Sequence, residues 1–172
     1  MLKNQIITLL SDDKPGIVES IASVITRHNG NWLESQLAQL GGKFAGVIRV
    51  QIEEEELQAL REALEQLSSQ QIRVYLDDCS EQTASTANNL TLSFHATGPD
   101  RPGIVREISS TLAQYQINLE KLDTRLSSMP YSGDPLFEAE GTMSVPPGLD
   151  RHQLEERLDE IANTLAMDIS LG

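Results

Sequence analysis

The hydrophobic positions of the chain follow two spacings, one typical of strands and one typical of helices. In KFAGVIRVQIE, residues 43–53, apolar or small residues occupy every second position from Phe44 to Ile52, which predicts a strand with one buried face. In PGIVESIASVITRH, residues 15–28, the apolar residues recur at helical spacing and share one helix face. They are Ile17, Ile21, Val24 and Ile25.

Three further elements complete the first half. QIITLLS, residues 5–11, and QIRVYLD, residues 71–77, are short apolar runs that predict strands. Leucines at helical spacing predict a second helix between them. They are Leu57, Leu60, Leu64 and Leu67. The stretch NWLESQLAQL, residues 31–40, has no clear period, but the Gly41–Gly42 pair after it predicts a tight hairpin into residues 43–53.

A run of four glutamates, Glu53 to Glu56, precedes the second helix. Carboxylates complement the positive end of a helix dipole, so the run favours a helix start over a metal site. The order of elements is then β-α-β-β-α-β, a known supersecondary pattern.

The second half predicts the same order. NLTLSFHAT, residues 89–97, is a strand, and apolar residues alternate from Phe137 to Val145. Two groups of apolar residues mark helices: Ile104, Ile108 and Leu112, then Leu154, Leu158, Ile161 and Leu165. The hairpin of this half is six residues longer, and the extra residues fall in SSMPYSGDP, residues 127–135. Its prolines and glycine predict a longer, structured turn.

The two halves also share a sequence repeat at an offset of 87 residues. DDKPGIVESI begins at Asp12 and PDRPGIVREI begins at Pro99, with eight identities over residues 13–31. Such a self-match indicates duplication, and two copies indicate paired domains. We expect a first domain at 1–78, a polar linker at 79–88 and a second domain at 89–172, with the two halves packed as a pseudo-twofold pair.

Composition narrows the possible functions. The net charge is −13 and aromatic residues make up 4% of the chain, a balance that disfavours direct binding to nucleic acid. The single cysteine, Cys79, excludes an intrachain disulfide. The N-terminal apolar run is too short for a signal peptide and no stretch is long enough to span a membrane, so we expect a soluble cytoplasmic protein.

The repeated Asp-x-Pro-Gly stretch joins a strand to a helix. Asp13 and Asp100 could cap the helices, and prolines suit a first helical turn. Gly16 and Gly103 carry no Cβ, so a backbone or a ligand could approach closely. The helix N-terminus behind the loop could bind an anion such as a carboxylate. The alternative is that the stretch is only an efficient turn, needed twice because the fold is built twice.

Two asparagines follow the loops at a constant distance. Asn31 and Asn118 each lie 18 residues after the loop aspartate, where the chain enters the second strand, expected beside the first. An amide offers a donor and an acceptor, which suits a zwitterionic ligand. The alternative role is that of an asparagine in a turn.

These residues resemble the ACT domain, a small-molecule-sensing module with a ferredoxin-like fold. The resemblance rests on D-[KR]-P-G-I-V after the first strand of each half, and on SGDPLFEAEGTMSVP, residues 132–146. The tandem arrangement is similar to that of the glycine cleavage system transcriptional repressor family. It implies an α+β fold of two ferredoxin-like βαββαβ domains in tandem, with antiparallel sheets and helices on one face.

The resemblance also implies a function. ACT domains pair side by side and bind amino acids between paired units, so we expect a regulatory protein and no enzyme, with glycine or a similar amino acid as effector. The implied ligand-binding residues are Asp13, Gly16, Asn31, Asp100, Gly103 and Asn118. No cofactor or metal is implied. The expected partners are a DNA-binding transcription factor or other protein and, through ACT pairing, a second copy of the chain.

Three other classes stay open at this stage. A pairing module without a ligand is the first. The second is a small acylphosphatase-like enzyme, with Lys14 or Arg101 in a phosphate-binding loop, although His28, His95 and His152 show no paired spacing. The third, an RNA-binding sheet of this topology, would need exposed aromatic residues and a basic stripe.

Overall fold

The computed structural model describes residues 1–80 and 88–172. The chain divides into two compact units, Met1–Glu81 and Gln82–Gly172. Most of the predicted linker, residues 81–87, lies outside the described residues, so the domain boundaries at 78 and 89 stay predictions.

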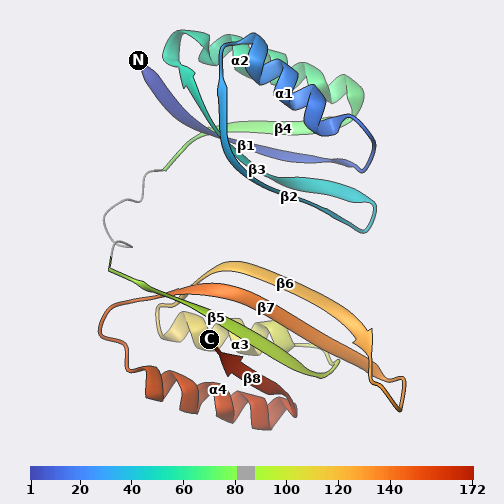
Figure 1. The fold of residues 1–172 in the computed structure, drawn as a ribbon, viewed down its shortest axis with the longest axis vertical. Helices are drawn as coiled ribbons and strands as arrows, with labels where there is room; N and C mark the ends of the chain where they lie inside the picture. Colours follow the sequence, from blue (N-terminus) through green and yellow to red (C-terminus); the bar gives the residue numbers. More distant parts are fainter. Residues whose placement is uncertain (81–87) are drawn as a thin grey trace. The chain divides into compact units, whose positions relative to one another are not determined.

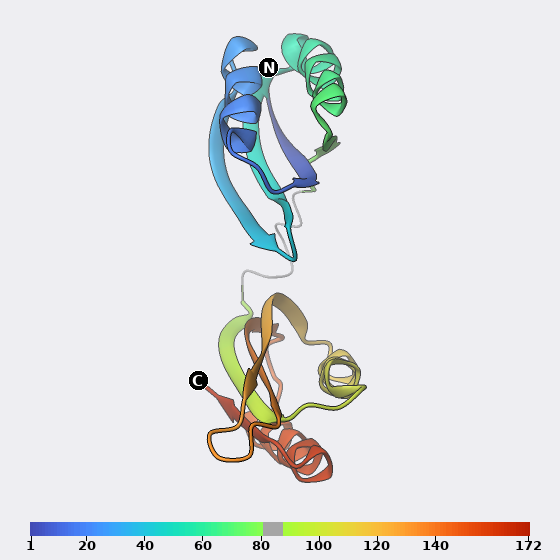
Figure 2. The same cartoon turned by 90° about the vertical axis from the view of Figure 1, so that its right-hand side faces the viewer.

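The first unit is a four-stranded antiparallel sheet with two helices on one face (Figures 1 and 2). Its strand order is β2-β3-β1-β4. The elements are β1 (Leu2–Asp12), α1 (Ile17–Arg27), β2 (Asn31–Leu40), β3 (Lys43–Glu53), the 3₁₀ turn η1 (Glu54–Glu56), α2 (Leu57–Glu65), the 3₁₀ turn η2 (Gln66–Gln70) and β4 (Ile72–Asp78). This confirms the predicted β-α-β-β-α-β order.

The second unit repeats the arrangement with the strand order β6-β7-β5-β8. Its elements are β5 (Leu90–Pro99), α3 (Ile104–Gln114), β6 (Asn118–Ser128), β7 (Pro135–Val145), α4 (Arg151–Leu165) and β8 (Asp168–Leu171). The predicted α+β class, with antiparallel sheets and helices on one face, is confirmed.

Each unit has its own hydrophobic core between sheet and helices. In the first unit the predicted helix face is buried, with Ile21 wholly inaccessible to solvent. It packs against alternating side chains of β1 and β3 such as Ile7 and Ile48. In the second unit Met143 and Leu154 are equally inaccessible. The periods of two and of about 3.6 residues therefore place one face of each element in a core.

The hairpin of the first unit has the two-residue turn that the glycine pair predicts. Gly41 and Gly42 have φ angles of 58° and 78°, as a type I′ turn requires, and Leu40 pairs with Lys43. The ambiguous stretch 31–40 is the edge strand β2. It pairs with β3 and lies two strands away from β1, so the expectation that it lies beside the first strand is wrong.

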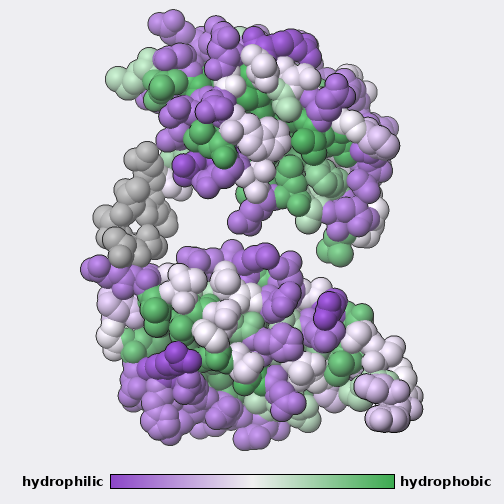
Figure 3. Space-filling view, in the orientation of Figure 1, coloured by the Kyte–Doolittle hydropathy of each residue, from purple (hydrophilic) through white to green (hydrophobic). Residues whose placement is uncertain are grey.

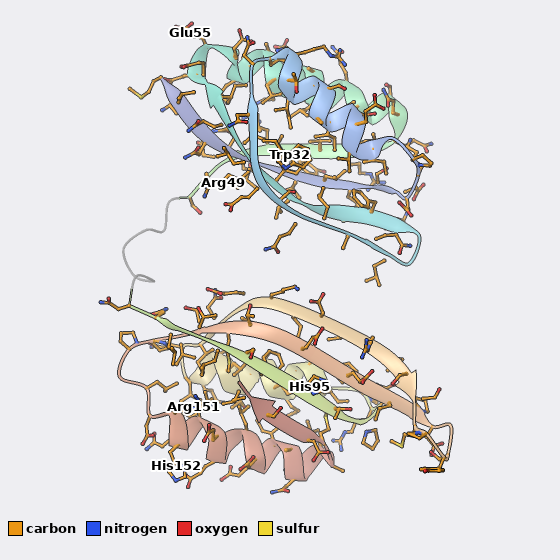
Figure 4. All side chains as sticks on the ribbon, in the orientation of Figure 1. Trp32, Arg49, Glu55, His95, Arg151 and His152 are labelled. Atoms are coloured by element: carbon orange, nitrogen blue, oxygen red, sulfur yellow. The ribbon has the colours of Figure 1, made fainter. Side chains whose placement is uncertain are left out.

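Glu53 ends β3, and the other three glutamates of the run form η1 and lead into α2, as expected from their charge. Within residues 1–80 and 88–172, no group of three or more His, Cys, Asp or Glu side chains could hold a metal ion. His95 lies on the sheet of the second unit and His152 on α4 (Figure 4). Among the described residues, none of the helices is long and apolar enough to cross a membrane.

Candidate ligand-binding site

Each unit passes from its first strand to its first helix through a Pro-Gly turn. Gly16 has φ 90° and ψ 1°, and Gly103 has φ 94° and ψ −2°. These angles are those of position i+2 in a type II turn, with proline at i+1. A Cβ built on Gly16 or Gly103 would meet no atom within 4 Å. Glycine is therefore needed for its positive φ, and the expected close approach of another backbone is not observed.

The predicted capping role of the two aspartates is wrong. The N-caps are Gly16 and Gly103, and neither helix start has a side-chain cap hydrogen bond. The Pro-Gly turn places each aspartate three residues before the N-cap, outside the first helical turn. Instead, the Asp13 N–H donates to the carbonyl of Gly42 over 2.9 Å, and the Asp100 N–H donates to that of Pro135 over 3.0 Å. Each loop is thus tied to the hairpin of its own unit.

A hollow of about 230 Å³ lies over the loop of the first unit. Its lining combines polar groups of the loop with apolar side chains of α1 and β3. The lining residues are Asp13, Lys14, Gly16, Ile17, Val18, Glu19 and Phe44. Asp13 and Gly16, two of the predicted ligand-binding residues, both line this hollow.

The hollow lies at the N-terminus of α1. The Gly16 carbonyl accepts the first helical hydrogen bond, from the Ser20 N–H at 2.9 Å. The N–H groups of residues 17–19, at the start of α1, have no acceptor within the helix. They form the positive end of the helix dipole. The hollow therefore offers donors for a carboxylate, the Asp13 carboxylate for an ammonium group, and apolar walls at Val18 and Phe44 for a small side chain.

Cations surround the loop without neutralising Asp13. The Lys14 ammonium donates to the carbonyl of Gln70, and the Lys43 ammonium pairs with Asp12. The hydrogen bond from Lys43 lowers the pKa of the Asp12 carboxyl from its usual value. Asp13 itself is exposed, so its carboxylate stays available to a ligand.

Asn31 lies at the opposite end of the sheet from this hollow. It pairs with Gln51 on β3, and Gln51 pairs with Asn4 near the start of β1. Asn4 and Asp12 are eight residues apart on β1, or about 26 Å at 3.3 Å per residue. A single unit therefore does not bring Asn31 together with Asp13 and Gly16.

In the second unit, too, the asparagine lies at the opposite end of the sheet from the loop residues. Asn118 is opposite Ser144, which pairs with Thr91 near the start of β5. Asp100 follows the other end of that strand. The predicted ligand set thus divides into two groups, Asp100 and Gly103 at one end and Asn118 at the other.

Val18 and Phe44 are functional candidates that the sequence analysis missed. A signal for Val18 was present: the repeat carries a valine after Ile17 and Ile104, outside the buried helix face, and both valines are exposed, at 44% and 43%. The sequence gives no such signal for Phe44. Its place in the alternating run of residues 43–53 predicted only that it packs in the core.

Replacing Gly16 with alanine should lower the free energy of unfolding of the first unit by about 1–2 kcal/mol, because a Cβ is strained at positive φ. Urea denaturation would measure it. Glu19→Ala, on the exposed side of α1, is the control, with an expected change within about 0.5 kcal/mol. An equally small change for Gly16→Ala would contradict the conformational role of this glycine.

Comparisons with known proteins agree with the fold. Residues 4–74 match the model of the ACT domain family. A structure of an unknown protein from Galdieria sulphuraria superposes with a TM-score of 0.84 at 22% identity, covering 99% of this chain and 98% of that one. A protein provisionally named a glycine cleavage system transcriptional repressor superposes with a TM-score of 0.69 at 20% identity, covering 100% and 97%. The comparison with curated proteins gives no match.

The family match covers the first unit, and the two structural matches cover both units. The second unit has the same strand order and the same Pro-Gly turn as the first. The first unit therefore matches the ACT domain family over residues 4–74, and the chain has the fold of two such units in tandem.

Proposed function

We propose that this protein is a regulator that senses a small amino acid such as glycine. The observation that carries the proposal is the hollow at the N-terminus of α1, which combines Asp13 with free helical N–H groups. An α-amino acid carries both complementary charges, on the ammonium and carboxylate groups of one α-carbon. Its carboxylate would face the helix N-terminus and its ammonium group would face Asp13. The reverse orientation would place two carboxylates together and is disfavoured.

A second unit would complete the site. Asn31 lies about 26 Å from the loop of its own unit by strand spacing, so both can touch one ligand only if two units pair with opposite orientation. Side-by-side pairing of edge strands in antiparallel sense places the loop end of one unit beside the asparagine end of the other. The exposed edge strands β2 and β6, which begin with Asn31 and Asn118, suit such a pairing.

We further propose that the output passes through a protein partner, with no reaction catalysed and no direct contact to nucleic acid. The chain carries a net charge of −13. Its electrostatic interaction with the phosphates of a nucleic acid is therefore unfavourable. An acidic surface can steer toward a basic protein such as a DNA-binding transcription factor. The fold of the provisionally named glycine cleavage repressor supports a role in transcription of amino-acid metabolism.

A thermal-shift screen of the twenty amino acids tests the sensing role. A ligand at ten times its Kd should stabilise the unit that binds it by about 1.4 kcal/mol, which corresponds to roughly 5–10 °C for a domain of this size. We expect the largest shift for glycine or another small amino acid, in line with the provisionally named glycine cleavage repressor that shares this fold. No shift for any amino acid at millimolar concentration would reject the proposal in favour of a pairing module without a ligand.

A further inference from the structure

The two helices of the second unit, α3 and α4, lie on the same face of its sheet (Figure 1) and enclose a hollow of about 250 Å³ between them. Each helix presents one stripe of side chains at helical spacing to this interhelical hollow. Most of the lining side chains are polar. They are Glu107, Ser110, Thr111 and Gln114 on α3, and Arg157, Glu160, Ile161, Thr164 and Leu165 on α4.

Thr111 is the buried polar residue of the interhelical hollow. It is 7% exposed, whereas threonine is mostly an exposed residue in folded proteins. Two other hydroxyls of these helices donate to backbone carbonyls of the preceding turn, Ser109 to Arg106 and Thr164 to Glu160. Within residues 1–80 and 88–172, the Thr111 hydroxyl makes no such bond. Burying a hydroxyl without a partner costs free energy, so this group calls for a physical explanation.

The first unit shows that the fold does not need a hydroxyl at this position. At the 87-residue offset of the repeat, Thr111 corresponds to Val24. Val24 is 6% exposed and belongs to the core of the first unit. Valine and threonine differ chiefly by the hydroxyl group, so packing of the helix against the core does not select threonine. A hydrogen bond to a molecule in the hollow is then the physical role that remains for the Thr111 hydroxyl.

The charged groups of the interhelical hollow are largely balanced. Arg157 pairs with Glu160 on the same helix. Glu107 lies in the first turn of α3, where its carboxylate complements the positive end of the helix dipole. The hydroxyls and the Gln114 amide supply both donors and acceptors. Balanced charge together with mixed donors and acceptors favours a neutral ligand whose own groups both donate and accept, as hydroxyl groups do.

The surroundings of the hollow also favour a water-soluble ligand. Hydrophilic residues cover the region of α4 in the space-filling view, at the bottom of the second unit (Figure 3). A protein partner is more often marked by a contiguous apolar patch, which this region lacks in that view.

We propose that the interhelical hollow of the second unit binds a small neutral polyhydroxylated molecule, a polyol or a monosaccharide. The Thr111 hydroxyl bonds one ligand hydroxyl at the floor, and Ser110 and Gln114 bond its neighbours. Ile161 and Leu165 contact the carbon atoms of the ligand. Each of these hydrogen bonds replaces one to water, so the affinity is modest and the Kd lies in the millimolar range. This site is separate from the hollow at α1 and does not rest on the amino-acid-sensing role.

A methyl NMR titration of the full chain, with ¹³C-labelled isoleucine δ1 methyl groups, tests this site. Ile161 lines the hollow and reports its occupancy. The probes are ribose, glucose and myo-inositol, each added up to about 50 mM to cover millimolar Kd values. At least one of them should shift the Ile161 signal to saturation. The signal of Ile21, buried in the core of the first unit, should not move.

Thr111→Val introduces the residue that the first unit carries, and should raise the Kd by about threefold to tenfold through loss of a neutral hydrogen bond. Its melting temperature should be equal to that of the wild-type chain or higher, because the hydroxyl has no partner in the protein. Ser110→Ala should also raise the Kd. Ser109→Ala is the matched control, because this neighbouring serine of α3 does not line the hollow, and it should leave the Kd unchanged.

Three results would overturn the proposal. One is the absence of a saturable Ile161 shift with all three probes, and another is an unchanged Kd in Thr111→Val. The third is a shift produced by glycine and by none of the three probes, which would assign the hollow to a zwitterion. The thermal-shift screen of amino acids is a separate readout, so failure here leaves the sensing role to its own test.

Discussion

Replacing Gly46 with alanine is expected to destabilise the first unit by roughly 3 kcal/mol or more. Gly46 lies on β3 opposite Leu37 of β2. A Cβ at this position would lie 2.0 Å from the carbonyl oxygen of Gln36 and 2.8 Å from Cα of Leu37. Both are backbone atoms of the neighbouring strand, so the strands must move apart. A unit of about 80 residues has a free energy of unfolding of about 4–12 kcal/mol in total, so the loss is severe.

Urea denaturation followed by tryptophan fluorescence measures this effect in the first unit alone. Trp32, the single tryptophan, lies on β2 and packs against the core of that unit. Gly41→Ala is the matched control, because Gly41 has φ 58° and no atom within 4 Å of a built Cβ. It should cost only about 1 kcal/mol. Equal denaturation midpoints for the two variants would show that the close approach at Gly46 has no energetic consequence.

The spacing of hydrophobic residues along the chain predicted most of the fold, because most helices and strands have one buried face. The edge strand β2 was predicted only from the glycine hairpin that follows it and not from its own spacing, and its side chains explain why. Only Trp32 and Leu37 are partly buried in it, and the register shifts between Trp32 and Glu34. A bulge moves the following side chains to the other face, so the sequence has no continuous period of two.

The candidate site was only partly predictable for a different reason. Asp13 and Gly16 are close in sequence, and a local motif was enough to find them. The apolar wall at Phe44 comes from a strand about thirty residues later, and the pairing of β3 with β1 places it there. The capping assignment was wrong because a Pro-Gly turn places glycine at the N-cap, an outcome that depends on backbone angles.

The asparagines and the loop aspartates should be equally necessary for amino-acid binding, although about 26 Å of strand separates them within a unit. Asp13→Ala with Asp100→Ala removes the ammonium contacts of both units, and Asn31→Ala with Asn118→Ala removes the amides. Each pair should raise the calorimetric Kd by about tenfold to a hundredfold, since a hydrogen bond to a charged group contributes about 1.5–3 kcal/mol. Asp159→Ala with Asn163→Ala, two exposed residues of α4, is the matched control and should leave the Kd unchanged. If the asparagine pair has no effect, the site is complete at the loop end of one unit and needs no second unit. If the aspartate pair has none, the hollow over the loop is not the site.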